Sequence, residues 1–345
     1  MNIHFERTQD LQKKLKKEKK QAIIFSTPRE VFYLTGFYQD RTFLLLTQKD
    51  VFVFLPKMFY EHFMQICNWA KVYIYENPYD CISKKVSDVK ITDVYFDGSI
   101  TLYDEAKRFK KMRFKNFSGF LKEFRMIKKG EELESVRKAC KIVSKAYKAI
   151  KPKIKVGVKE IEIARELEYL MMKMGASTRS FDTIVAFGEN SALPHHETSE
   201  RKLRRNEAVL IDFGCIYHRY CSDMTRTFFY GKPTEEFLKV YKTVELAQKK
   251  GIEAVKEGVL SDEIDKICRQ TISEHGYGQY FIHGTGHGVG LDIHEDPTLN
   301  PKTSIKLLQG MTITIEPGIY LYGKFGVRIE DTVCVRKDGC EIMTV

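Results

Sequence analysis

The chain has 345 residues, of which 43% are hydrophobic and 30% charged, and its formal net charge is +11. This length accommodates two domains with separate hydrophobic cores, and the composition is typical of a globular protein. No apolar run is long enough to cross a bilayer. The charged residues 1–20 lack the apolar segment of a secretory signal. These features predict a cytoplasmic enzyme or binding protein and exclude a membrane-spanning one.

The excess of positive charge raises the question of nucleic-acid binding. Its densest run is KKLKKEKK at residues 13–20, which combines with Leu11 and Leu15 like one face of an amphipathic helix. No aromatic residue that could stack on bases is interleaved with these lysines. The run is therefore interpreted as a solvated helix face, and no nucleic-acid partner is expected.

The cysteines do not suggest a disulfide framework. All eight are scattered along the chain, without a Cys-x-x-Cys pair. The chain is also far longer than small scaffolds that depend on disulfides. We therefore expect reduced and mostly buried thiols.

The first part of the chain, to about residue 99, is predicted to form a small α/β domain. Its apolar, β-rich runs are QAIIFS, TFLLLTQKDVFVFLPK with a turn at residues 48–50, KVYIY and DVYFDG. A helix is predicted at residues 58–70. The charged segment FLKEFRMIKKGEELESVRKA, which contains Gly130, is interpreted as the connection to a second domain. The expected domains are residues 1–122 and 123–345.

The second domain is predicted to contain helices, and the segments between and after them carry the candidate histidines and acids. Apolar residues at helical spacing predict helices over residues 133–150 and 161–171. Thr234 and Ser261 are predicted N-caps of two more helices, the second of which ends at Gly276.

The stretch HGTGHGVGLDIHEDP contains His283, His287 and His294. Histidines four apart could share a helix face and bind metal, as in zinc proteases, but glycine occupies every second position from 284 to 290 and disfavours a helix. No G-x-G-x-x-G register fits, which argues against a nucleotide loop. The pattern predicts a strand whose bare face admits another backbone or a ligand, with two histidines on one side. A bend or bulge is needed for His294 to join them.

Two apolar segments further predict hairpins that each carry a pair of acids. In VLIDFGCIYHRYCSDMTRTFFY, a turn between residues 217 and 218 would place Asp212 opposite Asp223. In TITIEPGIYLYGKFGVRIEDTV, a turn at Gly323 would place Glu316 opposite Glu330. Four carboxylates brought together repel one another unless a positive charge lies among them.

Two divalent metal ions would supply that charge and clamp a water or hydroxide between them. Carboxylates with one imidazole suit manganese, cobalt, iron or zinc. An ordinary surface charge or salt bridge is sufficient to explain Asp331 and Glu295. It explains the four hairpin acids poorly, because each lies in an apolar run where an unpaired charge is costly.

The motifs resemble those of the pita-bread metallopeptidases, which include aminopeptidase P, prolidase and methionine aminopeptidase. They are IDFG with Asp212, SDMTRT with Asp223, GHGVG with His287, IEPGIY with Glu316 and RIEDT with Glu330. Their order and approximate spacing match over residues 120–345. In the first domain, REVFYLTGF is similar to a segment of aminopeptidase P and prolidase. The resemblance implies an α/β (α+β) protein, with a small creatinase/prolidase-like domain followed by a catalytic pita-bread domain.

The resemblance also implies a dinuclear metal site. Asp212 would bind one metal ion, Asp223 and Glu330 would be shared, and His287 and Glu316 would complete the second. A hydroxide between the ions would attack the carbonyl that precedes proline, with Glu316 as general base.

Further residues would support this reaction. His283 and His294 would donate hydrogen bonds to the carbonyl oxygen as charge develops. His195, in SALPHHETSERKL, would hold the substrate, while the adjacent His196 is given no special role. Arg328 would pair with a ligand carboxylate. The glycines of the histidine stretch would leave room for the peptide.

Within this resemblance, the sequence favours an Xaa-Pro aminopeptidase acting on proline-containing peptides. The alternative is an Xaa-Pro dipeptidase, which often carries an arginine in the loop corresponding to residues 298–309. Here that loop has Lys302 and Lys306 but no arginine, although a lysine could serve as a point charge. A non-catalytic peptide-binding homologue or a metal-free, creatinase-like hydrolase fits less well, because all the ligand positions are present. A homodimer is expected from the resemblance alone.

Overall fold

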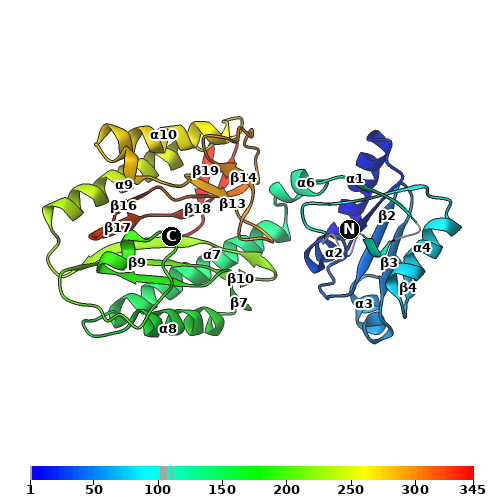
Figure 1. Cartoon of the computed structure of the whole chain (residues 1–345), viewed down its shortest axis with the longest axis horizontal. Coiled ribbons are helices and arrows are strands. Elements are labelled where there is room, and N and C mark those ends of the chain that lie inside the picture. Colours follow the sequence, from blue (N-terminus) through cyan, green and yellow to red (C-terminus); the bar gives the residue numbers. More distant parts are fainter. Residues whose placement is uncertain (1, 102–106, 110–111) are drawn as a thin grey trace. The chain divides into compact units, whose positions relative to one another are not determined.

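The computed structural model describes residues 2–101, 107–109 and 112–345 (Figure 1). The chain divides into two compact units, Met1–Leu121 and Lys122–Val345. Within the described ranges, no helix combines the length and apolar character of a membrane span.

Unit 1 is built on a six-stranded sheet with the order β4-β3-β2-β1-β5-β6. The strands are β1 (Ala22–Phe25), β2 (Phe43–Thr47), β3 (Val51–Leu55), β4 (Lys71–Ile74), β5 (Asp93–Phe96) and β6 (Arg113–Asn116). The predicted β2–β3 hairpin is confirmed, because these strands pair antiparallel with Leu46 opposite Val51. The buried apolar residues of β1, β2 and β3 form the centre of this unit.

The described helices of this unit are α1 (Ile3–Lys17), α2 (Pro28–Thr35), α3 (Tyr60–Ile66) and α4 (Pro78–Asp88). In α1, Leu11 and Leu15 are fully buried, which confirms the amphipathic helix. The helix predicted at residues 58–70 is shorter than expected. A 3-10 turn precedes it, and the backbone becomes extended at Cys67.

Unit 2 has two helix pairs, with strands lying between them (Figure 1). The pairs are α7 (Glu131–Ile150) with α8 (Glu160–Lys173), and α9 (Glu235–Ala254) with α10 (Ser261–Glu274). Apolar residues of α7 and α8 pack on β8 and β9 around Val143, Leu167 and Ile211. Those of α9 and α10 pack on the later strands, with Ile313 and Val333 in their core.

The strands of unit 2 form a three-stranded sheet β12-β9-β8, a three-stranded sheet β11-β10-β7, a five-stranded sheet β14-β13-β15-β18-β19 and the pair β16-β17. The bounds in the first half are β7 (Thr178–Arg179), β8 (Ile184–Phe187), β9 (Glu207–Phe213), β10 (Cys215–Tyr217), β11 (Tyr220–Cys221) and β12 (Met224–Tyr230). Those in the second half are β13 (Gly286–Gly288), β14 (Glu295–Leu299), β15 (Thr312–Ile315), β16 (Gly318–Leu321), β17 (Phe325–Arg328), β18 (Asp331–Arg336) and β19 (Gly339–Ile342). A short helix, α6 (Lys122–Met126), begins the unit.

The two predicted helix N-caps differ in outcome. Thr234 caps α9, since its side chain accepts a hydrogen bond from the backbone N–H of Phe237. The prediction for Ser261 is wrong, because Leu260 is the N-cap of α10. The Ser261 hydroxyl instead donates to the carbonyl of Thr303. All eight cysteines are free thiols, and most of them are buried, as expected.

Glu30, in the first turn of α2, is a buried acid in unit 1. Its carboxylate accepts hydrogen bonds from the backbone N–H and the hydroxyl of Thr27, at 3.2 and 2.9 Å. Burial outweighs these bonds and raises the pKa of Glu30 from 4.5 to about 7. The stability that protonated Glu30 contributes is therefore lost as the pH rises from about 4.5 through 7.

We expect Glu30→Gln to remove this loss. At pH 8, the free energy of unfolding of unit 1 should rise by on the order of 3 kcal/mol relative to the wild type, with little difference at pH 4.5. Denaturant titrations followed by the fluorescence of Trp69, the single tryptophan of the chain, report on this unit. An equal effect of the substitution at both pH values would contradict the assignment.

Candidate metal centre

Unit 2 contains a cavity of about 820 Å³. The ionisable residues that line it and were singled out from the sequence are His195, Asp212, Asp223, His283, His287, His294, Glu316, Arg328 and Glu330. The structure therefore brings every candidate site residue to one place. His196 also lines the cavity.

The first acid pair lies on the β9–β12 ladder, in a register that differs from the predicted one. Asp212 in β9 faces Thr225 of β12, two residues beyond Asp223. The turn falls at His218 and Arg219, which have positive φ angles of 46° and 73°. Because side chains on a strand alternate, a shift of two residues leaves the acids on the same face. Both still reach the cavity.

The second acid pair has the predicted register. Strands β16 and β17 pair with Gly318 opposite Arg328, and Gly323 at the turn has a φ of +74°. The same register continues in β15 and β18. Glu316 and Glu330 lie where β15 passes into β16 and β17 into β18, so they face each other across the ladder.

The glycine-rich stretch forms only the short strand β13, with an irregularity between Gly286 and Gly288. A Cβ added to Gly286 would lie 1.9 Å from the carbonyl oxygen of Thr314, and one at Gly288 would lie 2.3 Å from that of Asp296. Protein backbone fills the space that these glycines leave. Close backbone packing, one of the two predicted uses of the bare face, is therefore confirmed at these positions, while Gly284 and Gly286 also line the cavity.

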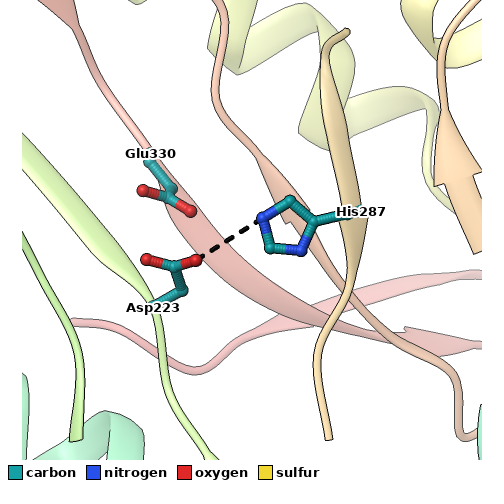
Figure 2. A group of neighbouring side chains, drawn as sticks. All are labelled: Asp223, His287 and Glu330. Atoms are coloured by element: carbon teal, nitrogen blue, oxygen red, sulfur yellow. Dashed lines mark ion pairs between the residues drawn. The ribbon is translucent and has the colours of Figure 1, made fainter. Parts of the chain in front are cut away.

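Asp223, His287 and Glu330 point toward one another at the centre of the site (Figure 2). One potential ligand atom from each lies within 4.8 Å of the others. The Nε2 of His287 is 3.5 Å from the carboxylate of Asp223 and 3.3 Å from that of Glu316. One oxygen of Asp212 lies 2.6 Å from the guanidinium of Arg328.

Three buried carboxylate oxygens in this centre have no hydrogen-bond partner among the described residues. They are Oδ1 of Asp212, Oδ1 of Asp223 and Oε1 of Glu330. A buried carboxylate oxygen without a partner is costly, because it has lost water without a replacement. Hard oxygen donors together with one imidazole nitrogen are ligands that suit divalent ions such as manganese, cobalt, zinc or iron. The residues therefore fit a metal centre.

The electrostatics of the acids show the same need for positive charge. Burial and the neighbouring Glu330 raise the pKa of Asp223 well above its ordinary value. Burial and Glu316 do the same to the pKa of Glu330. Burial would also raise the pKa of Glu316, but hydrogen bonding to His287 and the imidazole charge lower it to about 2. Positive charge thus decides which carboxylates ionise.

Arg328, buried at the end of β17, connects several of these groups. Besides Asp212, its guanidinium donates to the hydroxyls of Tyr320 at 2.7 Å and Thr225 at 3.1 Å. Thr225 in turn donates to Glu330 at 2.6 Å. Arg328 therefore orients one carboxylate directly and another through a threonine.

The histidines occupy different environments. His283 is hydrogen-bonded on both nitrogens, to the carbonyl of Gly284 at 2.7 Å and to the hydroxyl of Tyr320 at 2.8 Å. The ring of His294 packs edge-on against that of His287, with centroids 4.4 Å apart. Burial lowers the pKa of both His283 and His294. His195 is exposed at the cavity wall.

Glu295, just beyond His294, forms salt bridges, which is one of the two ordinary roles expected for it, but these salt bridges are buried. Its side chain is 8% exposed and pairs with Lys128 and Arg125, at 2.5 and 2.7 Å. Arg125 also pairs with Asp292. Lys128 is 1% exposed, so removal of Glu295 would leave a buried cation without its partner. These ion pairs tie the start of unit 2 to the loop that carries His294.

Sequence reasoning missed Tyr320, Thr225 and Thr314. The Thr314 hydroxyl accepts from the backbone N–H of His287 and donates to Glu316. Thr225 could have been found, because it follows Asp223 by two residues and shares its strand face. Tyr320 lies in the same predicted hairpin as its partner Arg328, whereas its other partner, His283, comes from another segment.

The comparisons with known proteins agree with this geometry. The family model for metallopeptidase family M24 matches residues 134–337, and that for the creatinase/prolidase N-terminal domain matches residues 7–127. The chain belongs to metallopeptidase family M24. The predicted resemblance and the fold class, a small α/β domain followed by a pita-bread domain, are thereby confirmed.

Similar relatives of this M24 protein include peptidases with solved structures. An Xaa-Pro dipeptidase of Pyrococcus furiosus is 36% identical, over 98% of this chain and 97% of the relative. The structure of an Xaa-Pro dipeptidase from Bacillus anthracis superposes with a TM-score of 0.96 at 34% identity, covering 99% of this chain and 97% of the other. An X-Pro aminopeptidase structure from Thermotoga maritima has a TM-score of 0.87 at 33% identity, covering 94% and 95%.

We expect Gly286→Ala to disrupt the centre, because the new methyl group would meet backbone that cannot move aside. The free energy of unfolding should fall by about 1–3 kcal/mol, and manganese affinity, measured calorimetrically, should fall with it. Gly339→Ala is the matched control, since an added Cβ there meets no atom within 4 Å. Equal behaviour of the two variants would argue against close packing at β13.

Proposed function

We propose that this protein is a metal-dependent Xaa-Pro dipeptidase. The observation that carries the proposal is the convergence of buried carboxylates, with three oxygens that lack partners among the described residues, on one imidazole. Membership of family M24 supports metal-dependent peptide hydrolysis. The relatives named Xaa-Pro dipeptidase support the dipeptidase activity. They favour this alternative over the aminopeptidase that the sequence suggested, although a relative named aminopeptidase also superposes well.

The metal ligands in this proposal are Asp212, Asp223, His287, Glu316 and Glu330. Two divalent ions held there would supply Lewis-acid charge that makes water nucleophilic near neutral pH. The three partnerless oxygens belong to Asp212, Asp223 and Glu330, which makes these acids the residues most dependent on added cations.

The other residues act on the peptide and on protons. Glu316, held by Thr314 at 3.1 Å, would accept the proton of the attacking water. His294 has no hydrogen bond among the described residues, so its N–H is free to donate to the carbonyl oxygen as negative charge develops. The two ring nitrogens of neutral His283 are hydrogen-bonded to Gly284 and Tyr320. His283 would therefore orient the hydroxyl of Tyr320. His195 would hold the peptide.

The test is product analysis by mass spectrometry with manganese or cobalt, before and after chelation. An Xaa-Pro dipeptide should be cleaved, a chelator should abolish cleavage, and an Xaa-Pro-Xaa tripeptide should be a poor substrate. Release of free Xaa from the tripeptide would instead establish the aminopeptidase. Absence of cleavage with every metal would contradict the enzyme and favour a peptide-binding protein.

Calorimetry should show two metal ions bound per chain. The substitution Asp223→Asn should weaken both metal binding and turnover.

A dipeptidase also needs a positive partner for the substrate carboxylate. Lys302 and Lys306, suggested by the sequence, are exposed and do not line the cavity. Arg179 lines it but pairs with Glu168 at 3.0 Å. Arg165, exposed on α8, lines the cavity and has no ion pair among the described residues. We therefore propose Arg165 as the partner.

Arg165→Gln should raise the KM for an Xaa-Pro dipeptide about tenfold, because a charge-assisted hydrogen bond to the carboxylate is lost. The C-terminal amide of the same dipeptide is the control. Its weaker cleavage should be insensitive to the substitution. Steady-state kinetics on both substrates measure this difference. An equal change in KM for the acid and the amide would exclude Arg165 as the partner of the carboxylate.

A further inference from the structure

Glu160, at the start of α8, is a fully buried carboxylate outside the metal centre. Its Oε1 accepts hydrogen bonds from the backbone N–H of Phe187 at 2.8 Å and the amide of Asn190 at 2.9 Å. Its Oε2 accepts from the ring of His196 at 2.9 Å, and from the backbone N–H and hydroxyl of Ser199 at 3.0 and 2.5 Å. All these donors belong to residues 187–199, which include His195.

The hydrogen bonds explain how a carboxylate persists at this depth. Burial alone would raise the pKa of Glu160, but the bonds from His196, Ser199, Phe187 and Asn190 outweigh it, so the pKa is lowered. Glu160 is therefore ionised at neutral pH. An ionised acceptor binds N–H and O–H donors more strongly than a neutral one, so the carboxylate gathers both ends of the loop onto α8.

The other side of the same loop is attached to β17. The Ser191 hydroxyl accepts from the backbone N–H of Gly326 at 2.9 Å. The carbonyl of Pro194, directly before His195, accepts a longer bond of 3.4 Å from Arg328. His195 thus lies between an anchor on α8 and an anchor on the strand that carries Arg328. His195 lines the same cavity as His283 and His294.

We propose that Glu160 is a positioning residue for peptide binding, because it holds the loop of residues 188–199 so that His195 faces the substrate. The inference rests on the proposed function for the role of His195. His196 takes part as one of the donors to Glu160. The described hydrogen bonds of Glu160 go to residues 187–199 and to none of the proposed metal ligands, so its effect should fall on peptide binding and leave metal binding intact.

The test is Glu160→Gln in the full-length, metal-loaded protein. Glutamine preserves the shape, but its amide nitrogen cannot accept the bonds that one carboxylate oxygen now accepts. We expect the KM for an Xaa-Pro dipeptide to rise on the order of tenfold, while kcat changes less than about twofold and manganese affinity is unchanged. Glu160→Asp, which retains the charge, should restore part of the loss.

A double-mutant cycle with His195→Ala separates positioning from general destabilisation. If Glu160 acts through His195, the double variant should have nearly the KM of His195→Ala, because the anchor has nothing left to position. Glu207→Gln is the matched control. Glu207 pairs with Arg201 at 2.7 Å in the following segment, and its loss should lower stability without raising KM. The proposal would be overturned if the effects of the two substitutions on KM multiplied in the double variant. It would also be overturned if kcat and metal affinity fell together with peptide binding in Glu160→Gln.

Hydrogen exchange provides a readout that does not depend on catalysis. In Glu160→Gln, protection should fall selectively in residues 188–199, whereas exchange in β9 and β12 stays at the wild-type rate. Should the wild type cleave no Xaa-Pro peptide, the proposed function fails, and this arm still tests whether Glu160 holds the loop. Unchanged protection in residues 188–199, or a uniform rise in exchange throughout unit 2, would contradict the anchor. If Glu160→Gln does not fold, His196→Asn should give the same pattern with smaller changes.

Discussion

Mutual repulsion among buried carboxylates is the constraint on which the rest of unit 2 depends. Four acids are brought to one cavity by paired strands, and the pKa of Asp223 and that of Glu330 are raised by burial and by neighbouring acids. Such an arrangement is unfavourable unless positive charge offsets it. Arg328 satisfies one oxygen of Asp212 and His287 interacts with Glu316, but three oxygens keep no partner among the described residues. The site is therefore built for cations that the polypeptide does not itself provide.

Much of this centre follows from the alternation of side chains on strands, which is why the sequence predicted it. The second hairpin was predicted in its correct register, because Gly323 marks the turn. The first was displaced by two residues, since His218 and Arg219 adopt positive φ without being glycine. The acids reached the same cavity regardless, because a displacement of two residues preserves the strand face. A displacement of one would have removed Asp223 from the site. Metal roles and two-ion stoichiometry remain predictions.

What the sequence could not predict are contacts between segments distant in the chain. The pairing of Arg328 with Asp212, the ion pairs of Glu295 with Lys128, and the protein backbone that fills the bare glycine face all depend on tertiary packing. The cation that could hold a substrate carboxylate is another such case. The sequence suggested Lys302 and Lys306 in the loop of residues 298–309, but neither lysine lines the cavity in the structure. Which cation reaches the substrate is a property of the folded surface, not of loop composition.

In unit 2, the proposed metal ligands and the proposed peptide-binding histidines lie on different kinds of element. The proposed metal ligands lie on or directly beside paired strands, where the ladder itself holds their spacing. His195 and His294 lie on loops, which the backbone alone would leave mobile. Each loop is held by buried charge: Glu160 accepts hydrogen bonds from the first, and the ion pairs of Glu295 hold the second. A loop anchored by a few charged contacts can be adjusted by single substitutions, whereas a strand ladder cannot. Variation in peptide selectivity within this fold can therefore arise at the anchors while the metal ligands stay constant.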